Sequence, residues 1–456
     1  YTGQIFDAVL QRLATRLGQE GQKLLVFNPH WQDWARLGGE PISVPAPEGW
    51  AQDSAIVDEK GETIPVQMDA SGQLHLLPQD IPAIGYRAYR AIENGAQAPA
   101  PSADITTLPG ELRLSNTYVD LSLDLHTGNL TRLVDRSNGE DWGGAQVGAL
   151  SVWEESGNDV TLRVTAGVAP VRDELESVRV TESGPLYTRI EVKKRLFHCD
   201  VQQSITVWNH APRVDLHTRL FWWGSRNRQV RLQLPGGEER RQITCGAPFY
   251  GANWTDIVEG TGPYNGDEIS PEDQMAYREV IGWLHLTHGE AGLTIFTAHP
   301  GFYQGEGGLS AVLLRTAPSC GDGRLYWENA GEQNFHFTLK FGGDDWQAAG
   351  APLAAEAFSR PPAARWVSCP GAVVALPESA SFLRCSDQAV LSALHPDKSG
   401  GKAVARLWNP SGKTLSVNLS GALANGTAQL CDLLENPEDS PSGAPGDWVI
   451  NLAPWA

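Results

Sequence analysis

Residues 245–283 hold side chains that suit a carbohydrate ligand. The stretch, CGAPFYGANWTDIVEGTGPYNGDEISPEDQMAYREVIGW, is rich in glycine, proline, acids and aromatic residues and has no helix or strand pattern. Long irregular loops are uncommon in compact domains and are often functional. Aromatic rings stack on the C–H faces of a sugar, and carboxylates and amides bind its hydroxyl groups. The candidates are Tyr250, Asn253, Trp254, Asp267 and Glu268. The alternative is a structural loop packed by its own aromatic rings.

Paired carboxylates are the second candidate chemistry. Glycoside hydrolysis uses two acids about 5 to 10 Å apart, on opposite sides of the sugar. Adjacent acids on a strand point to opposite faces, so Glu154 and Glu155 cannot serve one site. No pattern makes the loop acids converge, and solvated loop residues are the alternative. The remaining candidates are Asp256, Glu259, Asp267, Glu268, Glu272 and Asp273.

Metal and nucleophile patterns are weak. Two His-x-Asp patterns occur, at His198-Cys199-Asp200 and His395-Pro396-Asp397. Each pair would share one side of a strand, but a metal site needs further ligands, and no nearby cluster supplies them. His285 and His288 lack such partners and are expected at the surface. Neither a G-x-S-x-G elbow nor a phosphate-binding P-loop is present. These patterns predict neither a metal site nor a nucleophile of these kinds.

Composition limits the class of protein. The 456 residues are too many for one core and predict two to four domains. The net charge of −19 disfavours nucleic acid and anionic membranes. No apolar run approaches the roughly 18 to 20 residues of a membrane span. Six scattered cysteines without a C-x-x-C pair indicate reduced, buried thiols and a cytoplasmic protein. The 16 tryptophans suit both carbohydrate contact and large β cores.

One helix stands out among the elements that must position these residues. Residues 3–17 carry a single apolar stripe at helical spacing, made of Ile5, Phe6, Val9, Leu10, Leu13 and Leu17. A lone amphipathic helix needs a surface that buries its stripe. Within this chain only a sheet can provide that surface, unless a partner has been removed.

The rest of the chain predicts a mainly β protein with three sandwiches. Short strands with glycine and proline turns predict a small β-sandwich over 22–104, ending in an Ala/Pro-rich linker at 95–104. Numerous alternating strands, including a hairpin around the turn at 126–129, predict a large antiparallel double sheet over 105–360. A second linker at 351–365 with a short helical turn leads to a third sandwich over 361–456. The helix occupies 1–21.

The order of these elements resembles the C-terminal β half of the glycoside hydrolase family 38 α-mannosidases. The strings that carry the resemblance are VFNP, DIPAIGYRAYR, LSNTYVDLSLDLHTGNLTRL, QSITVWNHAPRVDLHTRL and LLRTAPSC. The resemblance implies β-sandwiches around a mutarotase-like super-sandwich. It also implies a retaining mechanism whose Asp nucleophile and zinc, held by two His and two Asp, belong to an N-terminal catalytic domain. None of that domain is in this sequence, so no zinc ligand and no nucleophile is carried over.

The resemblance predicts a non-catalytic chain that supports and walls the substrate cleft of an α-mannosidase-like hydrolase. The chain opens at Tyr1, and both ends look trimmed, so the helix is expected to be the last one of a missing bundle. The β half of the family lends side chains to the cleft, which adds Trp153 to the loop candidates. One alternative is a stand-alone carbohydrate-binding module. Another is a self-sufficient sugar enzyme using Glu154, Asp267, Glu268 or His285.

Overall fold

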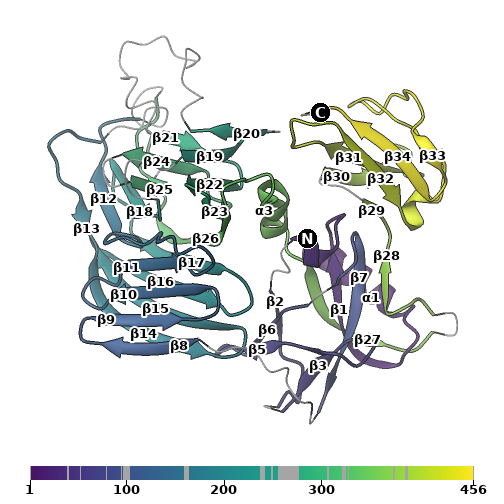
Figure 1. Cartoon of the computed structure of the whole chain (residues 1–456), viewed down its shortest axis with the longest axis horizontal. Helices are drawn as coiled ribbons and strands as arrows, with labels where there is room; N and C mark the ends of the chain where they lie inside the picture. Colours follow the sequence, from purple (N-terminus) through teal and green to yellow (C-terminus); the bar gives the residue numbers. More distant parts are fainter. Residues whose placement is uncertain are drawn as a thin grey trace. The chain divides into compact units, whose positions relative to one another are not determined.

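The computed structural model divides the chain into two compact units, one formed by residues 1–100 with 352–456 and the other by residues 101–351 (Figure 1). Each unit is described by itself. The residues described are 2–37, 41–51, 53–78, 80–93, 95, 103–158, 164–236, 242–247, 250–254, 277–305, 308–320, 325–326, 328–372, 375–385 and 389–454.

The first unit is built from antiparallel sheets that join the two ends of the sequence. As described, its largest sheet runs in the order β27 (Ala363–Cys369), β1 (Gly21–Asn28), β7 (Gly85–Ile92), β3 (Ala55–Val57) and β4 (Thr63–Ile64), with β28 (Ser379–Ser381) paired to β7. A smaller sheet holds β2 (Ile42–Pro45), β6 (Gln73–Leu76) and β5 (Val66–Met68). Strand β1 is buried on both faces, which explains its continuous apolar run LLVF.

The N-terminal helix α1 (Thr2–Ala14) packs on this sheet (Figure 1). Leu10 and Ala14, with Leu17 just beyond the helix, are buried against residues of β1, β7 and β27, namely Leu25, Tyr86, Ala88, Val367 and Cys369. Val9 is 55% exposed, so it lies at the edge of the stripe. The apolar stripe is therefore covered, at least in this part, by a sheet of the same chain.

Shortening Leu10 tests this packing. Leu10→Ala is expected to lower the free energy of unfolding by about 2 to 3 kcal/mol, because it removes buried methyl groups and leaves a cavity. Val9→Ala, on the exposed side of the same turn, should change it by less than about 0.5 kcal/mol. Urea denaturation followed by circular dichroism measures both, and equal effects would contradict the docking of α1.

The segment expected as the second linker is helix α3 (Ala351–Ser359) followed by the start of β27. Ala357 is buried in the core of the first unit, and Leu353 packs against that core. Beyond β27 the described chain forms one sheet of β29 (Arg384–Cys385), β32 (Leu415–Ser420), β34 (Asp447–Leu452) and β33 (Ser442–Ala444), and a pair of β30 (Val390–Pro396) and β31 (Ala403–Trp408). Short 3-10 helices lie at Trp34–Leu37 and Ala422–Ala424.

The second unit contains, among its described residues, three antiparallel sheets. A four-stranded sheet has the order β11 (Leu130–Asp135), β10 (Val119–Asp124), β9 (Glu111–Ser115) and β8 (Asp104–Leu108), and it confirms the predicted hairpin. The six-stranded sheet has the order β13 (Val171–Arg172), β12 (Leu150–Glu154), β18 (Arg228–Gln233), β25 (Gly308–Arg315), β24 (Gly301–Gly305) and β21 (Tyr277–Glu279).

The nine-stranded sheet runs in the order β14 (Glu174–Ser183), β15 (Tyr187–Leu196), β16 (Cys199–Trp208), β17 (Arg213–Trp222), β26 (Gly331–Gly343), β23 (Ala291–Thr297), β22 (Trp283–His288), β19 (Gln242–Ala247) and β20 (Tyr250–Asn253). One hydrophobic core contains apolar residues from all three sheets. The mainly β, antiparallel fold class is confirmed. In the described part of the chain, no helix is both long and apolar enough to cross a membrane.

Candidate functional site

The six-stranded sheet turns one apolar face to the core and a polar face away from it. On β18, Val230 and Leu232 belong to the core, so the alternating residues Gln229 and Arg231 face the other way. Directly opposed residues of neighbouring strands share a face, and they extend this set across the sheet. The polar face comprises Ser151, Trp153, Gln229, Arg231, Gln233, Tyr277, Tyr303, Ser310 and Arg315.

Arg231 lies between two aromatic rings at the centre of this face. Its guanidinium carbon is 3.8 Å from the ring centroid of Tyr303 on β24 and 4.9 Å from that of Trp153 on β12. The indole N–H of Trp153 donates to Ser151 Oγ at 2.9 Å, which fixes the ring. Burial lowers the pKa of Arg231 to about 10. The stacking holds a buried cation in one orientation.

A buried ion pair lies beside the aromatic pair. Arg315 Nε donates to Glu155 Oε1 at 2.8 Å, Arg315 Nη2 contacts the same oxygen, and Nη2 also donates to the Asn158 carbonyl at 2.6 Å. Burial raises the pKa of Glu155 despite this contact, and burial also raises that of Tyr277. Glu154 instead pairs with Arg228 at 3.3 Å near the surface. The two adjacent acids therefore separate, as strand geometry predicts.

Of the predicted ligand residues, Trp153, Asn253 and Trp254 have described side chains, and they lie in different surroundings. Trp153 belongs to the polar face and is half-buried. Trp254 is only 4% exposed and is part of the core, with Arg278 5.8 Å from its ring centroid, so an open stacking surface does not fit its position. Asn253, on β20, is exposed and accepts a bond from Thr244 Oγ1 at 3.3 Å. Asp267, Glu268 and the side chain of Tyr250 lie outside the described residues.

Sequence reasoning missed Arg231, Gln229, Tyr303 and Tyr277. One signal was available in the strand RQVRLQ, where polar residues alternate with core residues. Polar residues on the outward face of a double sheet are normally solvated, whereas Gln229 and Arg231 are buried.

The described His-x-Asp pairs do not gather into a metal site. Among the described residues, no group of three His, Cys, Asp or Glu side chains is placed to hold a metal ion. His285, expected at the surface, is buried, and its ring nitrogens contact Thr294 Oγ1 at 2.9 Å and the Asp344 carbonyl at 3.1 Å. The burial of His285 could not be predicted, because the sequence does not show which strands lie beside it. Four cysteines are buried, but Cys320 and Cys431 are exposed, contrary to expectation.

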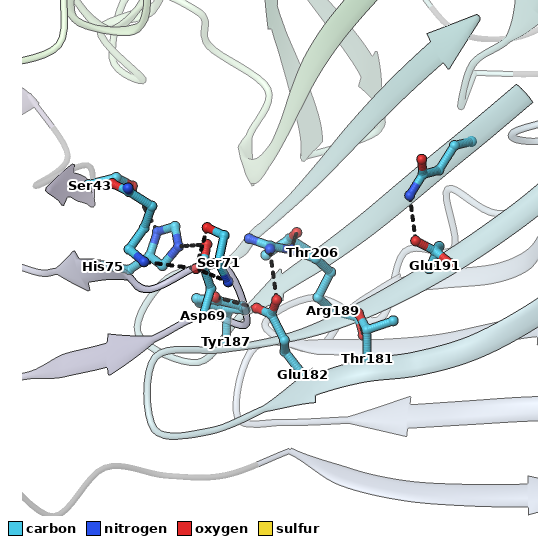
Figure 2. Close-up of polar contacts among 12 residues, drawn as sticks. Ser43, Asp69, Ser71, His75, Thr181, Glu182, Tyr187, Arg189, Glu191 and Thr206 are labelled. Carbon is cyan, nitrogen blue, oxygen red and sulfur yellow. Dashed lines mark hydrogen bonds and ion pairs between the residues drawn. The ribbon is translucent and has the colours of Figure 1, made fainter. Parts of the chain in front are cut away.

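A row of Ser43, His75 and Asp69 has the order of a hydrolase triad (Figure 2). Ser43 Oγ contacts His75 Nδ1 at 2.8 Å, and His75 Nε2 contacts Asp69 Oδ2 at 3.1 Å. Asp69 Oδ1 accepts from Ser71 N, Ser71 Oγ and Gln73 N, and although burial opposes it, these bonds lower the Asp69 pKa to about 2. Ser43 is exposed on its strand. The network therefore stabilises the turn between β5 and β6.

A cavity of about 240 Å³ lies in the first unit. Its walls are mainly apolar and include Trp31, Leu353 and Leu391, and its polar residues are His30, Glu356 and Arg360. Burial lowers the pKa of His30, whose Nε2 contacts the Arg360 carbonyl at 2.7 Å. None of the residues predicted from the sequence lines this cavity.

Comparisons with known proteins identify relatives of this fold. Residues 114–250 match the family described as glycosyl hydrolases family 38 C-terminal domain. The chain is similar to an α-mannosidase from Enterococcus faecalis V583, with a TM-score of 0.77 and 12% identity over 100% of this chain and 58% of that one. It is also similar to a glycosyl hydrolase family 38 protein from Enterococcus faecalis, with a TM-score of 0.75 and 13% identity over 98% and 59%. The chain spans about three fifths of these structures. No curated protein matches its sequence.

Proposed function

We propose that this chain, which resembles the C-terminal β portion of family 38 α-mannosidases along its length, is the β-sheet part of a glycoside hydrolase of that type. The observation that carries the proposal is the match of residues 114–250 to the family 38 C-terminal domain. The same fold over the whole chain in an α-mannosidase supports it. The substrate class is accordingly an α-mannoside or a related glycoside.

The chain supports the substrate cleft, and a further catalytic portion supplies the bond-breaking groups. In this proposal zinc is bound by that catalytic portion, and the described residues of the sheets hold no three-ligand metal cluster. The polar face supports this role, because it carries the half-buried aromatic residues Trp153 and Tyr303 beside buried polar groups on one sheet.

An activity assay tests this division of roles. The chain alone is expected to give no enzyme-like turnover of aryl α-mannosides, with or without added zinc, because in this proposal the catalytic portion supplies the acids and the metal that the reaction needs. Steady-state release of the aryl group measures this. The matched control is a full-length family 38 α-mannosidase in the same buffer. Turnover by the chain at a comparable rate would refute a non-catalytic role.

A stand-alone carbohydrate-binding module is the second candidate. The stacked Trp153 favours it, because an ordered indole on a polar surface is a common sugar contact. Intrinsic fluorescence titration of the chain with mannose oligosaccharides separates the two candidates. Tight binding by the chain alone favours a module, and an absence of binding favours a dependent part of an enzyme.

A further inference from the structure

Two buried donors on the polar face have no acceptor. Arg231 is 5% exposed and Gln229 is 0% exposed. Arg231 Nη2 and Gln229 Nε2 are both buried atoms without a hydrogen-bond partner in the part of the chain that is described. Buried polar groups are hydrogen-bonded in the great majority of cases, so adjacent orphan donors indicate a missing acceptor.

The two donors belong to side chains that are hydrogen-bonded to each other. Arg231 Nε donates to Gln229 Oε1 at 2.7 Å. A guanidinium can only donate, so the amide oxygen of Gln229 must face it and the amide N–H₂ must point elsewhere. The Tyr303 and Trp153 rings lie 3.8 and 4.9 Å from the guanidinium carbon and restrict its rotation. The unused N–H groups are therefore fixed in place before any ligand arrives.

The local charges leave one positive charge unmatched. Three buried or half-buried ionised groups meet here: the guanidinium groups of Arg231 and Arg315, and the carboxylate of Glu155. Glu155 uses Oε1 for Arg315, and its buried Oε2 has no partner among the described residues. Burying an unpaired cation is costly unless a counter-ion is supplied. Glu155 and Tyr303 act on Arg231 electrostatically, but the hydrogen bond of Glu155 goes to Arg315, so the two guanidinium groups share one carboxylate in the part described.

We propose that the polar face binds an oxyanion, a carboxylate or a phosphate group carried by a carbohydrate, at Arg231 Nη2 and Gln229 Nε2. The carbohydrate carrier rests on the proposed function, whereas the oxyanion site rests only on the donors and the charge. Carboxylate and phosphate oxygens accept from a guanidinium with similar geometry, so both belong to the same ligand class. The half-buried rings of Trp153 and Tyr303 flank the site and would contact the sugar.

The test is a titration of the whole chain at constant ionic strength. The probes are sodium phosphate, sodium acetate, glucose 6-phosphate, glucuronate and, as the neutral control, methyl α-glucoside. Calorimetry measures the affinity, and tryptophan fluorescence provides a second readout. Arg231→Gln is expected to weaken oxyanion binding by about 30-fold, the effect of losing a charged hydrogen-bond donor. Arg226→Gln is the matched control, because Arg226 also lies over a ring, that of Tyr326 at 4.5 Å, but is exposed and paired with Glu328.

A second variant keeps the test decisive if Arg231→Gln does not fold. Gln229→Glu preserves the shape of the side chain and gives Arg231 a carboxylate partner. It should keep or raise the melting temperature while abolishing oxyanion binding, because the site then contains its own anion. Binding that survives in both variants would overturn the proposal, as would no binding of any charged probe to the native chain.

The probes separate the two claims. Preference for acetate and glucuronate identifies a carboxylate ligand, and preference for phosphate and glucose 6-phosphate identifies a phosphate ligand; either supports the oxyanion site. If glucuronate binds no better than acetate, and glucose 6-phosphate no better than phosphate, the oxyanion site stands and the proposal of a carbohydrate carrier fails. Equal binding of methyl α-glucoside and glucuronate would refute the oxyanion site while supporting a neutral carbohydrate site.

Discussion

Replacing Asp215 with alanine is expected to lower the free energy of unfolding of the second unit by about 3 to 5 kcal/mol. Asp215 lies on β17 of the nine-stranded sheet and is buried. Its oxygens accept from Arg213 Nε and Nη2 at 2.8 and 3.0 Å, from Trp208 Nε1 at 2.8 Å and from Thr338 Oγ1 at 2.7 Å. Alanine removes the carboxylate and leaves a buried cation and two donors without that acceptor.

Urea denaturation at pH 7 measures the loss. Glu332→Ala is the matched control, since Glu332 pairs with Arg219 on the same two strands, β17 and β26, but at the exposed end of the sheet. Solvent screens that pair, so its removal should have a much smaller effect. Equal losses in the two variants would mean that the Asp215 network does not stabilise the unit.

The Asp215 carboxylate should also make the free energy of unfolding depend on pH in the acid range. Burial by itself raises the pKa of Asp215, but Arg213, His336 and the hydrogen bonds outweigh it and hold the pKa below its ordinary value. A folded-state pKa below the unfolded value gives stability that is complete above about pH 4 and is lost as the pH falls through the folded pKa. The native chain should lose stability in that acid range, and Asp215→Asn should show a shallower loss.

Gly292→Ala is expected to cost about 3 kcal/mol or more. A Cβ at Gly292 would lie 1.9 Å from the carbonyl oxygen of Gly343 and 2.8 Å from Cε1 of His285. The first contact is with backbone, so β23 and β26 must separate at this end to admit the methyl group. His285 would also have to move from the Asp344 carbonyl, 3.1 Å from its Nε2.

Gly342 offers the matched control. It is the direct cross-strand partner of Gly292, yet a Cβ at Gly342 would meet nothing within 4 Å. Neither glycine has a positive φ, so the comparison isolates the steric contact. Gly342→Ala should therefore leave the urea midpoint nearly unchanged. A similar loss in both variants would show that the spacing between β23 and β26 does not limit the side chain at position 292.

Much of the fold follows from local patterns. Period-two alternation predicted the strands on both sides of the 126–129 turn, and their pairing as β10 and β11 depends on residues close in sequence. The stripe on residues 3–17 predicted α1, but its partner could not be predicted, because β27 lies at the far end of the chain.

The candidate site was less predictable because it is assembled from distant strands. Trp153, Arg231 and Tyr303 come from β12, β18 and β24, and no local pattern links them. Composition drew attention to Trp254 instead, since an aromatic residue beside acids suits a sugar. Its burial depends on the core between the sheets, which a single sequence does not reveal.

The discontinuity of the first unit has a consequence for biosynthesis. Strand β1 pairs with β27, and the ribosome synthesises all of residues 101–351 after β1 and before β27. At roughly 5 to 20 residues per second, β1 and α1 leave the ribosome on the order of tens of seconds before β27 does. The inserted unit has its own core and can finish folding in that interval. Strand β7 can pair with the other edge of β1 in that interval, but the surface that β27 completes for α1 forms only when β27 emerges.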